Sequence, residues 1–524
     1  MGRLVSILLL LAATSQAALA DTTIAVIHSE AATPAEWREA LRTVGAIDAN
    51  DLVDPEFQIV ALGGGSVQHL DWLAKLSDSA NDQVHLLVSE ADLLLADKHP
   101  EVRAFISASP FVLQLGDWAF AYGGISGKYE NESVQELNQR IGIEITGYPR
   151  RVLELRSDGL LLSGESITQA EERLQRSAFK GKQKKQLAEV GEMMVASGRA
   201  PHQYRGSAIC HPYAESFNVE RFLKRTGARH LVVSTNDRKG MLRRMDGMVY
   251  AIGLTQSPDV LLLRNDVAQR ASGKSFDPDR RLISEQLSEM SDSEVERFLR
   301  KGEILRVEEI GTGITNPLRI TQQLDGITQD SVFKYVDSSP GLESKTRYAK
   351  RSEDSDRYIY EVVAYKLDRL LDLQMIPVAV QAEVNDKPGV LQDWITGAIN
   401  ERDRGESGQP FESACPQYEQ YRLRFVFDLL IHNEDRNLTN ILWDKEEYRL
   451  LFIDHTRAFR VTENRPDMYR SVELRVSDLL RKKLMSLSKA NLSQTLAPYL
   501  HPRQIEAILI RRDQILEDAL TTDL

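Results

Sequence analysis

Short apolar runs alternate with amphipathic stretches along the first half of the chain. The runs have the length and the β-branched content of strands, and they occupy residues 24–27, 58–62, 84–88, 111–124, 230–234 and 260–264. Between them, residues 37–47 and 216–228 carry apolar side chains at helical spacing and end near a glycine. We therefore expect a layered α/β domain at residues 21–264.

The pattern changes in the second half of the chain. Residues 265–301 are charged and polar, and we expect them to form a linker with a surface helix. Strands are then predicted at 304–310, 318–323, 331–336 and, as a pair, within 377–395, with a periodic helix at 357–371 and a further helix ending near Ile431. Strands followed by helices are typical of an α+β domain, which we place at residues 302–524.

Composition limits the size of the cores and the class of partner. A chain of 524 residues with 42% hydrophobic content can hold two cores, because single cores stop growing near ~250–300 residues. A net charge of −12 disfavours nucleic acid as a partner, since binding a phosphate backbone requires a basic surface.

The first residues have the pattern of a secretory signal peptide. A basic Arg3 precedes an apolar run at residues 4–12, and the small residues Ala18 and Ala20 form a cleavage site before Asp21. The alternative is a membrane anchor, but the run is shorter than the ~20 residues that span a bilayer. We expect a signal peptide at residues 1–20, a periplasmic or secreted protein, and no transmembrane segment in the mature chain.

Cys210 and Cys415 are the only cysteines of the chain. Export to an oxidising compartment permits a disulfide between them. They lie in domains that are predicted to be separate, however, and their positions in the sequence say nothing of their distance in space. Two buried thiols are therefore the favoured expectation, with a bridge as the alternative.

A glycine-rich turn and a lone lysine indicate a phosphate-binding site at the start of the second domain. Gly311, Gly313 and Thr315 lie between its first two strands, where backbone N–H groups are free to approach phosphates. Lys334, on the third strand, is placed to reach the same phosphates. By itself, such a turn is more often an ordinary hairpin. Glu361, on the apolar side of the next helix, is costly to bury unless Lys334 pairs with it, and a solvated edge position is the alternative.

The loop after the apolar helix carries the candidate chemistry. It presents Asp435 and, five residues later, Asn440, while Asp454 ends the strand pair that follows. A carboxylate that orients the attacking hydroxyl, an amide oxygen and a second carboxylate for a divalent metal ion form the set that phosphoryl transfer from ATP requires. Residues 389–395, which include Gln392, suit a hinge against which an adenine ring lies. Each of these residues alone is more often a helix cap or a surface group. The hypothesis of phosphoryl transfer therefore depends on the glycine turn, the lysine, the glutamate, Asp435, Asn440 and Asp454 occurring together in this order.

Two motifs in this region resemble those of a known kinase group. NEDRNLTN at residues 433–440 and FIDH at 452–455 are similar to the DR-x-x-x-N and D-[FH] segments of the phosphatidylinositol 3/4-kinase-like group, which includes HipA-type and secretory-pathway kinases. The likeness covers about residues 302–460. It implies a two-lobed, protein-kinase-like domain with its N-lobe at about 302–391 and its C-lobe at about 392–524.

This resemblance also implies a role for each candidate residue. By that likeness, Lys334 binds the ATP phosphates and Glu361 holds the lysine in place. Asp435 is the catalytic base, and Asn440 and Asp454 bind Mg²⁺ or Mn²⁺.

Two positions depart from the pattern of the family. Asn437 stands where the family often has histidine, and His455 stands where glycine is common beside the metal-binding aspartate. We expect the first to affect loop geometry and rate, and the second occurs in relatives of this branch. Neither departure removes a group that the chemistry needs.

The N-terminal half resembles the calcineurin-like metallophosphatases, in particular the Shewanella-like group. The likeness lies in the scaffold, at residues 37–48, 204–206, 215–233 and 246–253. The metal-binding motifs of such enzymes are missing at the corresponding segments, and Gly64 occupies the position of the bridging aspartate. His28, Glu30 and Glu90 remain as candidate ligands for one metal ion, although a structural or solvent-exposed role is favoured. We expect an inactive phosphatase-like domain that docks a substrate, binds an anion or regulates the kinase.

The leading hypothesis is an exported kinase that transfers the γ-phosphoryl group of ATP to a hydroxyl of a protein, glycan or lipid. One alternative is a metallophosphatase with atypical ligands, which the missing histidines disfavour. Another is a non-catalytic envelope scaffold, which the ordered set of kinase residues disfavours. Because the periplasm is poor in ATP, the sequence does not determine the phosphoryl donor. It does not identify the acceptor either.

Overall fold

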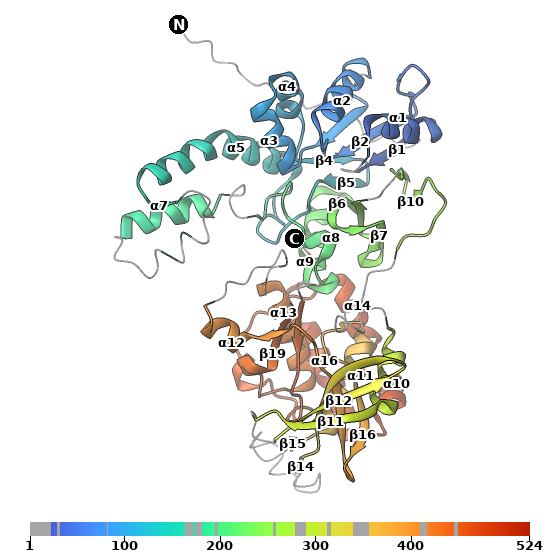
Figure 1. Ribbon diagram of the computed structural model, residues 1–524, viewed down its shortest axis with the longest axis vertical. Coiled ribbons are helices and arrows are strands. Elements are labelled where there is room, and N and C mark those ends of the chain that lie inside the picture. The colour runs from blue at the N-terminus through green and yellow to red at the C-terminus, as the bar shows by residue number, and fades with distance from the viewer. Residues whose placement is uncertain are drawn as a thin grey trace. The chain divides into compact units, whose positions relative to one another are not determined.

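Two units make up the chain in the computed structural model (Figure 1). One comprises Met1–Ala208 and Arg221–Pro278, and the other comprises Ile209–Glu220 and Asp279–Leu524. The structure describes residues 22–28, 32–80, 82–162, 170, 173, 181–193, 198–254, 258–277, 290–311, 316–338, 356–408, 415, 417–444 and 449–523. The predicted signal peptide lies outside these residues.

Two five-stranded sheets form the centre of the first unit, in the orders β10-β9-β1-β2-β3 and β4-β5-β6-β8-β7. The strands of the first sheet are β1 (Thr23–Ile27), β2 (Phe57–Leu62), β3 (Val84–Leu87), β9 (Leu261–Arg264) and β10 (Val267–Arg270). Those of the second are β4 (Val112–Leu115), β5 (Trp118–Ala121), β6 (His230–Lys239), β7 (Met241–Arg244) and β8 (Val249–Leu254). Val26 and Val60 of one sheet share a core with Phe120 and Ile252 of the other, so the two sheets pack face to face.

Helices connect and cover these strands. They are α1 (Pro34–Thr43), α2 (Val67–Ser79), α3 (Glu90–Lys98), α4 (Pro100–Ala108), α5 (Val134–Ser157), α7 (Gly181–Gly191) and α8 (Gly206–Ile209). Helix α9 (Pro212–Thr226) belongs to the second unit up to Glu220 and to the first unit from Arg221. The side chains of Thr33, Ser66, Ser89 and Ser133 accept backbone N–H groups at the first turns of α1, α2, α3 and α5, which fixes where these helices begin. Helices α5 and α7 pack around a small core of their own, and Figure 1 shows them extending away from the sheets of this unit.

The second unit contains a five-stranded antiparallel sheet of order β11-β12-β13-β17-β16. Its strands are β11 (Glu303–Glu309), β12 (Leu318–Leu324), β13 (Ile327–Lys334), β16 (Ala379–Val384) and β17 (Lys387–Asp393). Helices α10 (Asp292–Lys301) and α11 (Ile359–Leu371) both pack against β16 and β17.

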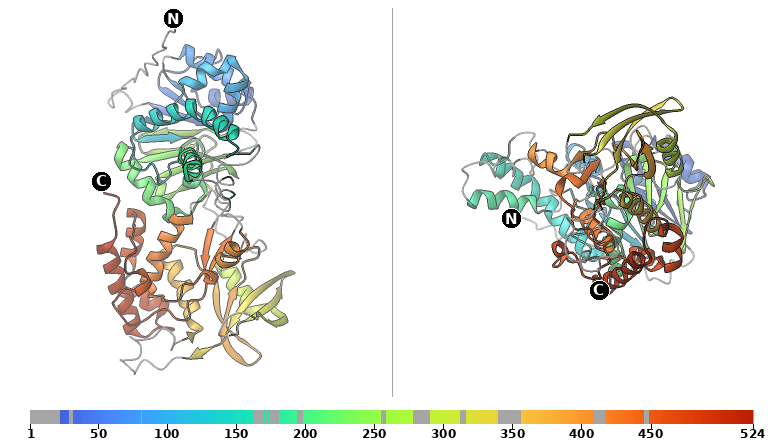
Figure 2. Two further views of the ribbon diagram at one scale, coloured as in Figure 1. Left: turned by 90° about the vertical axis from the view of Figure 1, so that its left-hand side faces the viewer. Right: turned by 90° about the horizontal axis from the view of Figure 1, so that it is seen from below.

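Helices dominate the remainder of this unit, and Figure 2 shows the red C-terminal helices and the yellow-green sheet on opposite sides of it. The helices are α12 (Glu401–Glu406), α13 (Gln417–Ile431), α14 (Asp478–Ser486), α15 (Lys489–Leu496) and α16 (Pro502–Asp518). Small sheets join β14 (Asp337–Ser338) to β15 (Asp356–Arg357), and β18 (Ile399–Asn400) to β19 (Ile441–Asp444) and β20 (Arg449–Phe452). The predicted α/β and α+β fold classes are confirmed. Within the described part of the chain, no helix has both the length and the apolar character that crossing a bilayer requires.

The predicted linker at residues 265–301 is wrong in one respect. Val267–Arg270 form the edge strand β10, which pairs with β9, because exposed and half-buried side chains alternate there with the period of a strand. Helix α10 forms at Asp292–Lys301 as an amphipathic surface helix, which buries Val295, Phe298 and Leu299 and exposes most of its other residues.

The prediction of two free thiols is also wrong, because Cys210 and Cys415 form a disulfide. The boundary at residue 264 assigns Cys210 to the N-terminal domain, whereas the structure groups Ile209–Glu220 with the second unit. His211 Nε2 hydrogen-bonds to the carbonyl of Leu373 there. A separation of 205 residues hides this packing from a reading of the sequence.

Candidate active site

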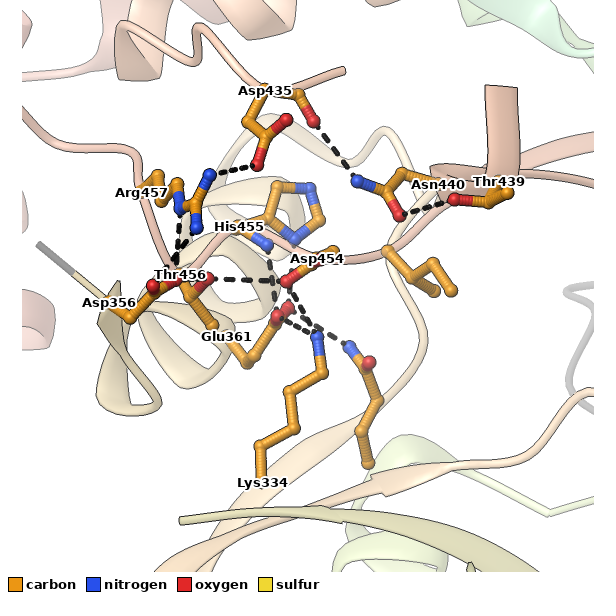
Figure 3. A network of polar contacts seen from close by, with 12 residues as sticks. Lys334, Asp356, Glu361, Asp435, Thr439, Asn440, Asp454, His455, Thr456 and Arg457 are labelled. Carbon is orange, nitrogen blue, oxygen red and sulfur yellow. Dashed lines mark hydrogen bonds and ion pairs between the residues drawn. The ribbon is translucent and has the colours of Figure 1, made fainter. Parts of the chain in front are cut away.

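A buried ion pair between Lys334 and Glu361 forms the centre of the candidate site (Figure 3). Lys334 ends β13, and Glu361 is fully buried in the first turn of α11. Lys334 Nζ donates a hydrogen bond to Glu361 Oε1 at 2.6 Å. Burial opposes both charges, but Lys334 and a hydrogen bond from His455 hold the pKa of Glu361 below its usual value. At Lys334, burial lowers the pKa, but the carboxylates of Asp454 and Glu361 raise it by more, so the pKa of Lys334 lies above its usual value.

The remaining acceptor positions of the Glu361 carboxylate are also occupied. The backbone N–H of His455 donates to Oε1 at 2.9 Å, and His455 Nδ1 lies 2.9 Å from Oε2. Gln392 Nε2 lies 3.5 Å from the same Oε2. Burial, followed by the nearby Arg436, lowers the pKa of His455, so the neutral ring can donate from Nδ1. The histidine that departs from the family pattern thus helps to fix the glutamate.

Asp454 connects this pair to the open part of the site. It follows β20 with a left-handed backbone, φ 63°, which costs on the order of 1–3 kcal/mol outside glycine and is typical of functional positions. Its Oδ1 accepts hydrogen bonds from Lys334 Nζ at 3.0 Å and from Thr456 Oγ1 at 3.3 Å. Since the side chain is 38% exposed, its other oxygen can reach a ligand.

Asp435 and Asn440 form a second group of polar side chains. Asn440 Nδ2 donates to the backbone carbonyl of Asp435 at 3.0 Å, which orients the amide oxygen as an acceptor for a neighbouring group. The carboxylate of Asp435 is 35% exposed and accepts a hydrogen bond from Arg457 Nη1 at 3.0 Å. Burial raises the pKa of Asp435, and the Arg457 guanidinium partly offsets this effect. The group therefore offers one carboxylate and one amide oxygen to a ligand.

A buried pair of Asp428 and Arg436 supports both groups, and the sequence analysis missed it. Asp428, on α13, accepts from Arg436 Nη2 at 2.9 Å and Nε at 3.2 Å, and from Tyr469 Oη at 2.8 Å. Arg436 Nη1 in turn donates to the carbonyls of Asn440 and Ile453, the residue before Asp454. A carboxylate inside the apolar run FVFDLLI is the signal that could have found this pair, because a buried charge requires a partner.

The structure brings most of the predicted residues together. Figure 3 shows the side chains of five of them in one network: Lys334, Glu361, Asp435, Asn440 and Asp454. Gly311 has a left-handed backbone, φ 72°, and an added Cβ there would meet no atom of the described residues within 4 Å. Gly313 and Thr315 lie outside the described residues.

The corresponding region of the first unit has few groups that could hold a metal ion. The backbone N–H of Gly64 donates to Asp92 at 3.0 Å, and a Cβ at Gly64 would lie 2.3 Å from Leu70 Cδ2. A side chain at this position would therefore clash with the core. His28 Nδ1 hydrogen-bonds to the carbonyl of Leu62, and Glu30 lies outside the described residues. Within the part that the structure describes, no three His, Cys, Asp or Glu side chains are grouped as metal ligands.

Comparison with known families supports the character of the second unit. Residues 399–478, which include the whole loop from Asp435 to Asp454, match the model of the HipA-like kinase family. The expected resemblance to HipA-type kinases is confirmed over this segment, so the C-terminal part of the chain is kinase-like. No curated protein matches the sequence.

Solved structures of both expected kinds are similar to parts of the chain. A cold-active protein-tyrosine phosphatase of a psychrophilic Shewanella species is 15% identical, with 48% of this chain and 79% of that chain covered and a TM-score of 0.35. The Golgi casein kinase with Mn/ADP bound is 15% identical, with 46% and 77% covered and a TM-score of 0.33. Hydra Fam20 with sugar is 16% identical, with 46% and 90% covered and a TM-score of 0.33. Because these TM-scores are low, the function proposed below rests on the residues of this chain.

Proposed function

We propose that the second unit is a kinase that transfers the γ-phosphoryl group of ATP to an alcohol group. The observation that carries the proposal is the network of Lys334, Glu361 and Asp454 beside Asp435 and Asn440. A lysine held by a buried glutamate is a fixed cation for phosphate oxygens, and it is the arrangement that kinases use. The match of residues 399–478 to HipA-like kinases supports the same chemistry.

Asn440 and Asp454 are the residues that would hold Mg²⁺ or Mn²⁺. Their amide and carboxylate oxygens are hard donors of the kind that these cations prefer. These two residues suit a metal ion. Asn440 Nδ2 donates to the Asp435 carbonyl, which directs the amide oxygen of Asn440 away from that bond, and the side chain of Asp454 is 38% exposed. When bound, such an ion neutralises charge on the ATP phosphates. Lys334 would then bind the phosphates, and Gln392, which contacts Glu361, would lie beside the adenine end of the nucleotide.

Asp435 would act as the base toward the acceptor hydroxyl. Its half-exposed carboxylate can accept a proton from a hydroxyl group that approaches the loop. The acceptor is a hydroxyl of a protein, a glycan or a lipid. The alternative of a scaffold without catalysis is disfavoured, because such a protein does not need a charged, buried Glu361, whose burial is unfavourable and is offset by Lys334 and His455.

The first unit would serve docking or regulation rather than hydrolysis. In support, Gly64 leaves no space for the aspartate that bridges two metal ions in metallophosphatases. A metallophosphatase with atypical ligands is therefore the weaker candidate. Export to the periplasm or beyond is supported by the Cys210–Cys415 disulfide, since such bridges persist in oxidising compartments.

Phosphoryl transfer from labelled ATP tests this proposal. The purified protein would be incubated with Mn²⁺ or Mg²⁺ and ATP labelled at the γ-phosphate, and label in the protein itself, in casein and in released phosphate would be measured. We expect transfer that depends on the metal and falls about 10²–10⁴-fold in Asp435→Asn, as loss of a general base predicts. Equal label with wild type and variant would refute the assignment of the base.

A further inference from the structure

Arg457 forms an ion pair with the proposed base, Asp435. Its Nη1 donates to Asp435 Oδ2 at 3.0 Å, while its Nε and Nη2 donate to the two oxygens of Asp356, each at 3.1 Å. One guanidinium thus bridges two carboxylates from different parts of the unit (Figure 3). Arg457 is largely buried, with 16% of its side chain exposed, so the bridge is shielded from solvent.

Asp356 ties this bridge to the strand and the helix that carry the ion pair. It lies in β15, which pairs with β14 just after Lys334 and directly precedes α11 with Glu361. Its Oδ1 also accepts from Thr456 Oγ1 at 2.9 Å, and the backbone N–H of Arg357 donates to the carbonyl of Thr456 at 2.9 Å. The segment after Asp454 is therefore fastened to β15 at several points.

We infer that Arg457 is a positioning residue, held by Asp356, that orients the Asp435 carboxylate toward the acceptor hydroxyl. The inference rests on the proposed kinase function and adds a residue to it. Arg457 uses one nitrogen for Asp435 and the other two for Asp356, so the guanidinium cannot turn away from the base without losing its contacts with Asp356.

Substitutions at the two ends of the bridge separate positioning from damage to the fold. Arg457→Gln removes the contact with Asp435, so kcat should fall while the KM for ATP stays close to that of the wild type. Arg457→Lys keeps a cation but cannot bridge both carboxylates, so its kcat should lie between those of the wild type and Arg457→Gln. Asp356→Asn weakens the hold on Arg457, so kcat should fall, and adding Arg457→Gln to it should lower kcat little further. General damage to the fold would lower nucleotide affinity together with kcat.

Turnover of labelled ATP by the full protein at neutral pH tests the inference, with phosphate release as the readout and nucleotide affinity measured alongside. We expect kcat of Arg457→Gln to fall by about tenfold to a hundredfold, less than the roughly 10²–10⁴-fold expected for loss of the base, with the KM for ATP little changed. An active wild type whose kcat is unchanged in Arg457→Gln, or a kcat and a nucleotide affinity that fall together in this variant, overturns the inference and leaves the kinase proposal standing. A wild type without turnover overturns the kinase proposal and the inference with it.

Discussion

The buried carboxylate of Asp393 makes the stability of the second unit dependent on pH. Asp393 ends β17, opposite Ser331 of β13, and is 3% exposed. Among the described residues, neither carboxylate oxygen has a hydrogen bond of good geometry, and the nearby Gln329 side chain and Trp394 backbone N–H offset the effect of burial only in part. Burial raises the pKa of Asp393 to about 8, so the folded protein keeps this group protonated at neutral pH.

The direction of the pH dependence follows from the pKa of Asp393 in the folded and in the unfolded chain. An aspartate in the unfolded chain titrates near ~3.9, so between about pH 4 and pH 8 the unfolded chain loses a proton that the folded chain retains. The protonated group makes its full contribution to the free energy of unfolding below about pH 4. This contribution decreases as the pH rises and is lost at about pH 8. Four pKa units at about 1.4 kcal/mol each set a ceiling near 6 kcal/mol. Because buried sites relax and admit water, we expect about 2–3 kcal/mol.

Asp393→Asn keeps the shape of the side chain and removes the ionisation. We expect the variant to unfold at the same temperature as the wild type near pH 4–5 and at a higher temperature at pH 8.5, by roughly 4–8 °C for a difference of this size. Calorimetric unfolding of both proteins across this pH range is the assay. Asp386→Asn, an exposed position in the turn between β16 and β17, is the matched control and should leave the melting temperature unchanged at every pH. A difference for Asp393→Asn that does not grow with pH would contradict the reasoning.

Four further substitutions probe the support of the site. Asp428→Ala removes the carboxylate that pairs with the buried Arg436 and should lower the free energy of unfolding in urea by ~3–5 kcal/mol. Tyr469→Phe removes one hydrogen bond to the same carboxylate and should cost less, about 1.5–3 kcal/mol. Cys415→Ser breaks the bridge to Cys210 and should cost ~2–5 kcal/mol, and a reducing agent should destabilise the wild type but not the variant. Gly389→Ala would place a Cβ 2.5 Å from the backbone carbonyl oxygen of Lys334 in β13. This clash should displace the strand that carries the lysine, so nucleotide affinity should fall. An affinity equal to that of the wild type would show that the strand accommodates the added methyl group without moving Lys334.

Local patterns predicted the elements that position the site. Most strands of the two large domains follow directly from apolar runs, including β13 with Lys334, and helix α11 with Glu361 follows from its apolar periodicity. Many other helices, such as α2–α5 and α14–α16, were not predicted. The pairing of these two residues could also be expected, because a glutamate on a buried helix face requires a cation. Strand β10 was missed, since a short edge strand with polar residues has little apolar signal.

Contacts between distant segments could not be predicted in the same way. The Cys210–Cys415 bridge depends on the packing of Ile209–Glu220 with the second unit, which no local pattern encodes. The bridge of Arg457 between Asp435 and Asp356 is of the same kind, because 101 residues separate Arg457 from Asp356. Such contacts depend on how the chain folds in three dimensions. The sequence alone indicates which residues can take part in the chemistry, but not which distant residues they contact.

Metal-dependent nucleotide binding tests the central claim most directly. Titration calorimetry of the purified protein with ATP would be performed with Mn²⁺, with Mg²⁺ and with a chelator, beside Asp454→Asn and the exposed control Asp386→Asn. We predict binding by the wild type and the control that requires the metal ion and is lost in Asp454→Asn, because Asp454 supplies a carboxylate that contacts Lys334 and faces the open site. Absence of nucleotide binding in the wild type, or equal binding in Asp454→Asn, would contradict the claim that these residues form a kinase site.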